Sequence, residues 1–457
     1  MRQPELPRHF GRVTPRLRRT SLIAAGAGMA LLVAACGSNS SANSSSGGKS
    51  SGGKEVLKIA TWHGTATSPF NQINKDFMKK YPNIKVELDY APDTSGPYKT
   101  LLQTTVDNRT AGIVTNTTAV NPLPLHASRS TETAGQFWAT SGAFISLNGQ
   151  SFLKDYQKAA LASDLYKGQQ TGLPYTAWNL GIFYNKTLFK KYGLKVPTTY
   201  NEFIKVLQTF KSKGIIPLFD GLGGVGGSYL SFLYDALYED VWGSTLPNDD
   251  LSSALTHNKV KWTDPKDIQV LSELHAVAQY LEPGYAGTSY TQMPGSIASG
   301  KAAMLLDGSW DVGSVVKDSK GKYQFGYFPV PGSNNPADNK SVLSVGETFN
   351  VVKGAPSTDA AMKWLAFFSS PKEYAKWIVA TGASSTEVGS DHFPGVTAKT
   401  MGNWFGKGWD SPLIEPAFPA SGSFYDQSAN WPTMLLDVAQ GSKSPQAAAE
   451  TIQKGWP

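Results

Sequence analysis

Aromatic and acidic side chains follow several predicted strands and turns of this 457-residue chain. Trp62 and His63 directly follow the first predicted strand, the place where ligands bind in an open α/β sheet. Trp310 follows a turn that begins at Asp307, and Asp220 ends another predicted strand. A sugar presents an apolar face and a ring of hydroxyl groups, which aromatic rings and carboxylates complement. These residue types therefore indicate a site for a hydroxyl-rich ligand.

Some of these signals also have a plainer structural explanation. A tryptophan is often a packed core residue, and Trp364 is expected to be one because Leu365 and Phe368 share its helical spacing. The glycine-rich run 221–227 contains a G-x-G-x-x-G match, but no convincing helix with an acidic residue about 20 positions on follows it. We interpret the run as a flexible loop after Asp220 rather than a nucleotide site.

The elements that must position these residues begin with a strand, a helix and a second strand. Residues 56–61 are predicted to form the first strand, and apolar residues recur at helical spacing from Phe70 to Tyr81. Residues 84–90 alternate between apolar and charged types, as a half-buried strand does. A unit of this length predicts a βαβ arrangement with parallel strands.

The same alternation continues through the chain. Thr199 and Glu202 form a predicted capping box, in which each side chain accepts from the backbone N–H of the other, and a strand should follow from Ile215. Further helices are predicted to begin near Pro265 and Thr358. Alternating helices and strands indicate α/β layers, and the chain length suggests two such lobes.

The only cysteine, Cys36, separates a basic and apolar head from a serine- and glycine-rich segment. Six arginines and one glutamate precede 15 mostly apolar residues, the order typical of an export signal too short to span a membrane. The spacing Val33-Ala34-Ala35-Cys36 resembles the bacterial lipobox, in which the chain is cut before a lipid-bearing cysteine. We expect a signal peptide at 1–35 and a lipidated Cys36 with a flexible tether at 36–54. The general secretory and twin-arginine routes both stay open.

Composition argues against several other classes of protein. The arginines of the head supply much of the formal net charge of +7, so no basic stripe is left for a nucleic acid. A single cysteine excludes an intrachain disulfide, and the six histidines make no spacing typical of a metal site. We therefore expect no nucleic-acid partner, no metal and no cofactor.

Two stretches carry a recognisable pattern. The first comprises TGLPY at 171–175, GIFYNK at 181–186 and PTTYNE at 197–202. The second comprises GKAAM at 300–304, DGSW at 307–310 and FGYFPVPG at 325–332. Together they resemble the family 1, maltose-binding-protein-like extracellular solute-binding proteins of bacterial carbohydrate ABC importers, and the resemblance covers roughly residues 55–457.

The resemblance implies an α/β, two-lobed periplasmic-binding-protein-like fold, with a ligand cleft between lobes joined by hinge crossings. It places these crossings near 175–180, 325–329 and 352–357. The expected domains are 55–177 plus 327–354 for lobe 1 and 178–326 plus 355–457 for lobe 2.

The resemblance also extends the list of candidate ligand residues. It places Trp178 at the first crossing, the region of Trp310 in the cleft of the second lobe, and the segment 346–349 facing the cleft. At that segment and at 111–118 the chain departs from the family pattern, which leaves the identity of the ligand open. The complete set of expected ligand-binding residues is Trp62, His63, Trp178, Asp220, Asp307, Trp310 and Glu347.

The expected function is carbohydrate capture by hinge closure and delivery to the permease subunits of an ABC transporter. The protein is expected to be a monomer, lipid-anchored through Cys36 to the outer face of the cytoplasmic membrane, and not an enzyme. The alternatives are a secreted glycosidase, which needs a carboxylate pair that the sequence does not single out, or a passive surface lipoprotein.

Overall fold

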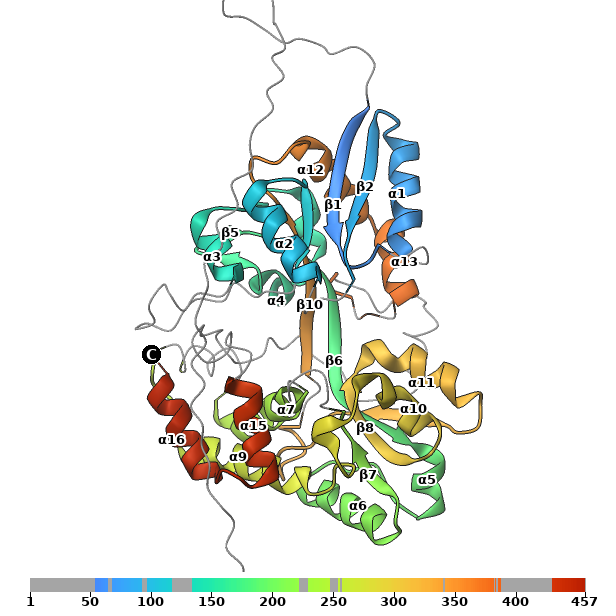
Figure 1. The fold of residues 1–457 in the computed structure, drawn as a ribbon, viewed down its shortest axis with the longest axis vertical. Coiled ribbons are helices and arrows are strands. Elements are labelled where there is room, and N and C mark those ends of the chain that lie inside the picture. Colours follow the sequence, from blue (N-terminus) through green and yellow to red (C-terminus); the bar gives the residue numbers. More distant parts are fainter. Residues whose placement is uncertain are drawn as a thin grey trace, which may run out of the picture. The chain divides into compact units, whose positions relative to one another are not determined.

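The predicted strand, helix and strand at the start of the fold are confirmed. In the computed structural model, β1 (Glu55–Thr61) and β2 (Ile84–Tyr90) pair in parallel, and α1 (Pro69–Lys80) connects them (Figure 1). The side chain of Ser68 caps α1 by accepting from the N–H of Phe70 at 3.3 Å. The structure describes residues 54–64, 68–92, 97–116, 134–221, 229–246, 254, 257–339, 342–381, 383, 385–387 and 430–456.

One mixed sheet runs through the fold in the order β2-β1-β3-β10-β6-β8-β7, and β9 pairs with β6 off this path. The pairs β1–β2, β1–β3 and β7–β8 are parallel, whereas every pair made by β6 or β10 is antiparallel. The strands not yet given are β3 (Ile113–Asn116), β4 (Leu165–Tyr166), β5 (Gln169–Gln170), β6 (Leu173–Asn185), β7 (Ile216–Phe219), β8 (Ala302–Gly308), β9 (Phe325–Phe328) and β10 (Val342–Val351).

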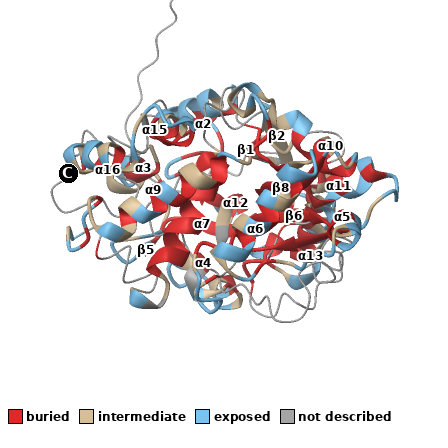
Figure 2. Ribbon diagram, turned by 90° about the horizontal axis from the view of Figure 1, so that it is seen from below, coloured by how far each residue is buried: buried red, intermediate tan, exposed pale blue. Residues whose placement is uncertain are grey.

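Helices cover this sheet, and burial is concentrated in its central strands and in α7, which is buried along most of its length (Figure 2). The α-helices after α1 are α2 (Pro97–Asn108), α3 (Ala134–Ser141), α4 (Lys158–Ala162), α5 (Lys186–Lys191), α6 (Tyr200–Ser212), α7 (Leu230–Trp242), α9 (Pro265–Ala278), α10 (Met293–Ala298), α11 (Val312–Ser319), α12 (Thr358–Phe368), α13 (Pro371–Thr381), α15 (Asn430–Gln440) and α16 (Pro445–Gly455). Short 3₁₀ turns are η2 (Ser151–Asp155), η3 (Gly243–Thr245), η4 (Tyr285–Gly287), η5 (Tyr290–Gln292) and η6 (Ser309–Asp311).

Separate hydrophobic clusters give the fold two lobes. One lobe is built on β1, β2, β3, α1 and α2, and the other on β7, β8, β9 and the helices α5, α6, α7 and α9. Strand β6 belongs to both, since Leu173 and Tyr175 lie in a first-lobe cluster whereas Ile182 and Tyr184 lie in a second-lobe cluster. We propose that β6 makes the first crossing, near the expected 175–180.

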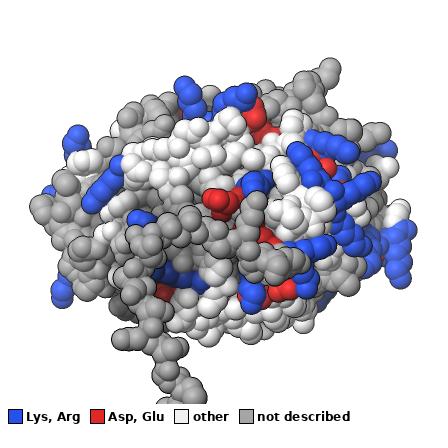
Figure 3. Space-filling view, turned by 90° about the horizontal axis from the view of Figure 1, so that it is seen from above, with Lys and Arg blue, Asp and Glu red and all other residues white. Residues whose placement is uncertain are grey.

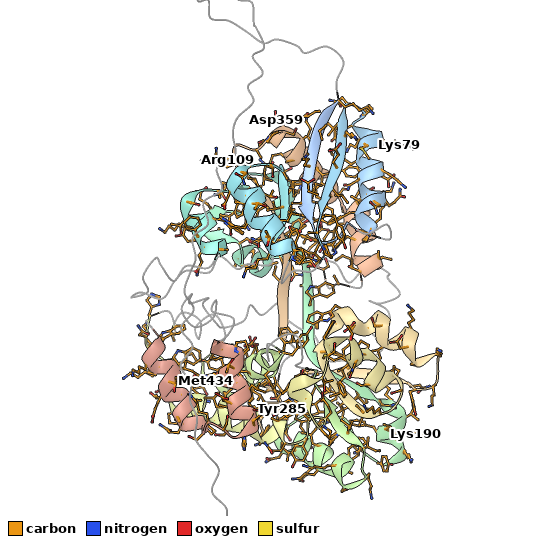
Figure 4. All side chains as sticks on the ribbon, in the orientation of Figure 1. Lys79, Arg109, Lys190, Tyr285, Asp359 and Met434 are labelled. Atoms are coloured by element: carbon orange, nitrogen blue, oxygen red, sulfur yellow. The ribbon has the colours of Figure 1, made fainter. Side chains whose placement is uncertain are left out.

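The clusters group two segments differently from the expected domain boundaries. Helices α12 and α13 pack in the first lobe, where the Trp364 indole N–H donates to Asn74 Oδ1 at 2.8 Å. Figure 4 places Asp359 of α12 in the same lobe as Lys79 and Arg109. Strand β9, in contrast, packs in the second lobe. We propose boundaries that assign α12 and α13 to lobe 1 and β9 to lobe 2.

The other two expected crossings are also placed differently. The second passage between lobes is β10 itself, which pairs with β3 through its last residues and with β6 along most of its length. It does not occur at 325–329 or at 352–357. Helices α15 and α16 pack in the second lobe, and residues 388–429 lie outside the described residues, as does Cys36.

The predicted capping box at α6 forms in part. Thr199 Oγ1 accepts from the N–H of Glu202 at 3.2 Å, as expected. The Glu202 carboxylate accepts its closest hydrogen bonds from Thr198, from the N–H at 2.8 Å and from the hydroxyl at 2.9 Å. Helix α6 starts where the pattern predicts. The residue before the N-cap, Thr198, donates the hydrogen bonds that the Glu202 carboxylate accepts.

Among the described residues, no helix combines the length and the apolar character needed to cross a membrane.

Replacing Trp364 by Ala is expected to destabilise the protein by about 3 to 5 kcal/mol, the usual cost of removing a large buried aromatic ring. Trp364 is fully buried and contacts Phe70, Phe349 and Phe368. Urea unfolding followed by circular dichroism measures the change. The control is Lys363→Ala in the same helix, which is exposed and should change stability by no more than about 0.5 kcal/mol. A cost below about 1 kcal/mol for Trp364→Ala contradicts the packing.

Candidate functional site

The first part of the candidate site is a hydrogen-bonded group of three side chains that lie far apart in the sequence. Glu347 Oε2 contacts His63 Nε2 at 2.9 Å and also accepts a hydrogen bond from the hydroxyl of Tyr175. Glu347 is buried, and His63 is partly buried. The structure thus brings together two predicted site residues, His63 and Glu347, and adds Tyr175.

The carboxyl end of β1 positions His63 and Trp62. The N–H of His63 donates to Thr61 Oγ1 at 3.0 Å, which fixes the chain as it leaves the strand. The His63 ring packs edge-to-face on Trp377 of α13 at 4.9 Å, and the Trp62 ring packs on Tyr98 of α2 at 4.8 Å. Both predicted residues are therefore held by helices of the first lobe.

An irregularity in the β6–β10 ladder brings Glu347 to His63 and Tyr175. Val345 pairs with Ala177, and Glu347 pairs with Thr176, so Gly346 is an extra residue on β10. A second register shift follows directly, before Thr348. Such bulges bend a strand and re-aim its side chains. Two successive shifts therefore set the direction of the Glu347 carboxylate.

The protonation of Tyr175 suits a donor role. Burial raises the pKa of the Tyr175 hydroxyl well above its usual range, and the neighbouring Glu347 carboxylate adds to the rise. Burial also raises the pKa of Tyr98, whose hydroxyl lies 2.6 Å from the carbonyl oxygen of Thr115. Both hydroxyls stay protonated at neutral pH, so Tyr175 remains a donor to Glu347.

The second part of the site is a pair of tryptophans from the two lobes. The rings of Trp178 on β6 and Trp310 in η6 meet edge-to-face, with centroids 5.8 Å apart and planes at 83°. The Trp310 indole N–H donates to the Tyr290 hydroxyl at 2.9 Å, and this hydroxyl donates to Asp311 Oδ2 at 2.7 Å. Tyr229 stacks on Tyr290 at 5.2 Å. Both predicted tryptophans are therefore neighbours, and both are partly buried.

The two predicted aspartates lie deeper in the second lobe. Asp307 Oδ1 accepts from the N–H of Gly308 at 2.8 Å, and the N–H of Asp220 donates to Glu282 Oε2 at 3.0 Å. In the described part of the chain, Asp307 Oδ2 and both carboxylate oxygens of Asp220 lack a hydrogen-bond partner. Of the glycine-rich run 221–227, predicted to be a loop, all residues after Gly221 lie outside the described residues.

Burial controls the ionisation of these aspartates. It raises the pKa of the Asp307 carboxyl well above the usual range, and the nearby Asp311 carboxyl adds to the effect. Burial raises the pKa of Asp220 in the same way, with a further contribution from Glu282. Burial therefore shifts both carboxyls toward the neutral form, in which an Asp can donate as well as accept a hydrogen bond.

The two parts of the site meet at Gly346 of β10, where the Trp178 ring lies beside Glu347. The Trp178 ring lies against Gly346, the residue next to Glu347, and the Trp310 ring lies against Gly308, the residue next to Asp307. Asp220 is connected to this region through its electrostatic effects on Asp307 and Tyr229. The predicted residues thus form one connected region, in which Asp220 is the most remote.

Sequence reasoning missed several residues of this region. Tyr175 lies in the TGLPY stretch, and its position on the first crossing could have marked it as a candidate. Tyr290, Tyr229 and Trp377 reach the region from η5, the start of α7 and α13. No spacing relative to the predicted residues signals these three, because tertiary packing alone brings them near.

No group of three or more His, Cys, Asp or Glu side chains in the described ranges could hold a metal ion.

Residues 62–375 match the family model of bacterial extracellular solute-binding proteins, and the chain belongs to this family. A multiple sugar-binding protein of Streptococcus mutans is 30% identical over 264 residues, which cover 57% of this chain and 58% of that protein. The match therefore spans less than two thirds of the Streptococcus protein.

Two further similarities agree with the family. An uncharacterized ABC transporter extracellular-binding protein of Pyrococcus horikoshii is 26% identical over 320 residues, covering 68% of this chain and 67% of that protein. The structure of a family 1 extracellular solute-binding protein from Bifidobacterium longum subsp. infantis superposes with a TM-score of 0.68 at 21% identity, covering 89% of this chain and 99% of the other. The predicted two-lobed fold class is confirmed.

Membership in the family decides between the classes of function considered from the sequence. Its members are extracytoplasmic binding proteins that serve transporters, and not enzymes. A glycosidase is therefore not favoured, nor is a passive surface lipoprotein.

Replacing Asp307 by Asn is expected to reduce the dependence of stability on pH. The pKa of this carboxyl is higher in the folded state than in the unfolded state. Its contribution to the free energy of unfolding is therefore fully present below the unfolded pKa of about 3.9, and it is lost as the pH rises through the pKa of the folded state. Urea unfolding at about pH 5 and about pH 7.5 measures this loss. Asp318→Asn, an exposed change on α11, is the control and should leave the pH dependence as in the wild type. Equal pH dependence in Asp307→Asn and the wild type contradicts the assignment.

Proposed function

We propose that this chain is the lipid-anchored substrate-binding component of an ABC transporter, and that its ligand is a sugar or oligosaccharide. The observation that carries the proposal is the pair Trp178 and Trp310, which come from different lobes and meet where β6 passes from one lobe to the other. Aromatic rings at such a place suit the apolar faces of sugar rings. The name of the Streptococcus mutans relative supports the same class of ligand.

The polar groups beside these rings suit a neutral ligand rich in hydroxyls. Glu347 supplies a carboxylate next to Trp178, and Asp311 supplies one next to Trp310 through Tyr290. Carboxylates accept hydrogen bonds from hydroxyl groups, whereas they repel phosphate. The proposed ligand is therefore an uncharged carbohydrate rather than a sugar phosphate.

Hinge closure is the proposed mechanism of capture. Only β6 and β10 among the described segments carry the chain between the lobes, so a change in their backbone can move one lobe relative to the other. A ligand that contacts groups of both lobes favours the closed arrangement by its differential affinity for it. The permease then recognises the closed form.

The proposed anchor and partners complete the transport function. Lipid on Cys36, which lies outside the described residues, holds the protein at the outer face of the cytoplasmic membrane. The tether of residues 36–54 keeps a monomeric receptor and its captured sugar at high effective concentration beside the permease. The ligand and the permease subunits are the proposed partners.

Changing Trp310 to Ala is expected to weaken carbohydrate binding about tenfold or more, because loss of an aromatic contact worth about 1.4 kcal/mol corresponds to a factor of ten. Calorimetry of the wild type against a panel of mono- and oligosaccharides identifies the ligand and should give saturable one-to-one binding. Tyr81→Ala, at the far end of the β1–β2 pair from His63, is the control and should keep the wild-type affinity.

Two results would overturn this proposal. Consumption of the sugar during the titration would indicate an enzyme, and binding of none of the panel would exclude a carbohydrate receptor. An unchanged dissociation constant in folded Trp310→Ala would remove Trp310 from the site while leaving the receptor function in place.

Changing Cys36 to Ala is expected to release the protein from the membrane without affecting sugar binding, because the anchor and the candidate site share no residue. Fractionation of cells into membrane and soluble parts measures the release, and calorimetry of the released protein measures binding. A variant that stays in the membrane fraction contradicts the anchor, and the control Ser38→Ala should stay there as the wild type does.

A further inference from the structure

Each indole of the tryptophan pair lies directly on a glycine. A Cβ added at Gly346 would lie 2.1 Å from Trp178 Cδ1 and 2.2 Å from its Nε1. A Cβ added at Gly308 would lie 2.1 Å from Trp310 Cζ3 and 2.2 Å from its Cη2. These separations are far below the distance of an ordinary carbon contact. Any side chain at either position would therefore displace the ring.

The backbone does not explain why these two positions are glycine. Gly308 has a φ of −85° and a ψ of 161°, an extended conformation that any residue adopts. Gly346 is not among the described glycines with positive φ. What both positions require is therefore space for an indole, and not the conformational freedom of glycine.

Both glycines also sit beside the acidic residues of the candidate site. Gly346 is the extra residue of the β10 bulge and precedes Glu347. Gly308 ends β8, pairs with Leu180 of β6 and follows Asp307. Each glycine therefore lies under one indole and is the chain neighbour of one acidic residue, so the two side chains have linked positions. The two rings touch, so a shift of one also changes the contact made by the other.

We propose that Gly346 and Gly308 are positioning residues that seat Trp178 and Trp310 for ligand binding and thereby help to set which ligand the protein accepts. The part concerning the ligand rests on the proposed function. The part concerning the rings does not, since it follows from the distances alone. A methyl group at either position is expected to push the indole away from the glycine, and at Gly308 this shift should also break the hydrogen bond from Trp310 to Tyr290.

The test uses Gly346→Ala and Gly308→Ala in the full chain. Near-ultraviolet circular dichroism without ligand reports the coupling of the two indoles, and each change is expected to alter that spectrum. Calorimetry with the sugar that binds the wild type is expected to show about a tenfold or greater loss of affinity. Far-ultraviolet circular dichroism checks that each variant is folded.

Two glycines elsewhere provide matched controls. Gly326 in β9 is equally crowded, with Tyr184 Cε1 2.2 Å from an added Cβ, but it lies under a tyrosine outside the pair. Gly326→Ala can therefore cost stability but should keep the affinity and the tryptophan signal. An added Cβ at Gly313 meets nothing within 4 Å, so Gly313→Ala should behave as the wild type.

A double variant separates positioning from a general structural role. If Gly346 acts through the Trp178 ring, adding Gly346→Ala to Trp178→Ala should cause no further loss of affinity. If Gly346→Ala alone fails to fold, removal of the obstructing ring in the double variant should restore folding. A double variant that remains unfolded, or that loses further affinity, contradicts the proposal.

Unchanged near-ultraviolet spectra in both folded glycine variants would overturn the ring placement. Altered spectra with wild-type affinity would overturn the role in ligand binding. If the wild type binds no carbohydrate, the proposed function fails, but the spectra still decide whether the glycines seat the rings.

Discussion

The antiparallel pairing of β6 with β10 is the constraint on which the rest of the structure depends. Both strands are shared by the lobes, and their ladder runs from Val342 opposite Leu180 to Phe349 opposite Leu173. Backbone hydrogen bonds along this ladder hold two separate hydrophobic clusters in one sheet. Because each lobe has its own core, a change in the ladder can move one lobe without disturbing the packing of the other.

The candidate site lies on this same ladder and depends on its irregularities. A regular register would place successive side chains on alternate faces, but the extra residue Gly346 changes that order before Glu347. The buried Glu347 carboxylate is then satisfied by His63 and Tyr175, which offsets the cost of removing it from water. Side chains of both lobes therefore meet at the segments that would move during closure. Under the proposed function, a ligand bound here would act directly on the hinge.

Around the tryptophan pair, small residues matter as much as the aromatic ones. On the face shown in Figure 3, Lys and Arg side chains lie mainly toward the periphery, with a few Asp and Glu side chains among them. Inside, by contrast, Gly308 and Gly346 leave room for two indoles, and the carboxyl of Asp307 is kept away from water. The chemistry available near the rings is therefore set by packing and burial rather than by the overall charge of the protein.

Local patterns allowed much of the fold to be predicted. Spacings of a few residues predict the βαβ unit, the start of α6 at Thr199 and the buried face of α12 with Trp364. Each of these features depends only on residues within one segment. The lobe against which each segment packs was not predictable in this way. An apolar face on α12 does not specify which lobe it covers, so the boundary that we propose there differs from the expected one, as does the proposed second crossing from those expected at 325–329 and 352–357.

The sequence by itself determined the family, the alternation of strands and helices, and the residue types that the proposed sugar site needs, because these depend on order and local spacing. Tertiary structure alone decided that Glu347 meets His63 and Tyr175, that Trp178 and Trp310 touch across the lobes, and that two glycines seat them. These contacts join residues separated by more than a hundred positions or depend on a bulge in one strand. Their geometry is fixed only when the strands pair and the hydrophobic cores pack, so the spacing of residues along the sequence does not predict it.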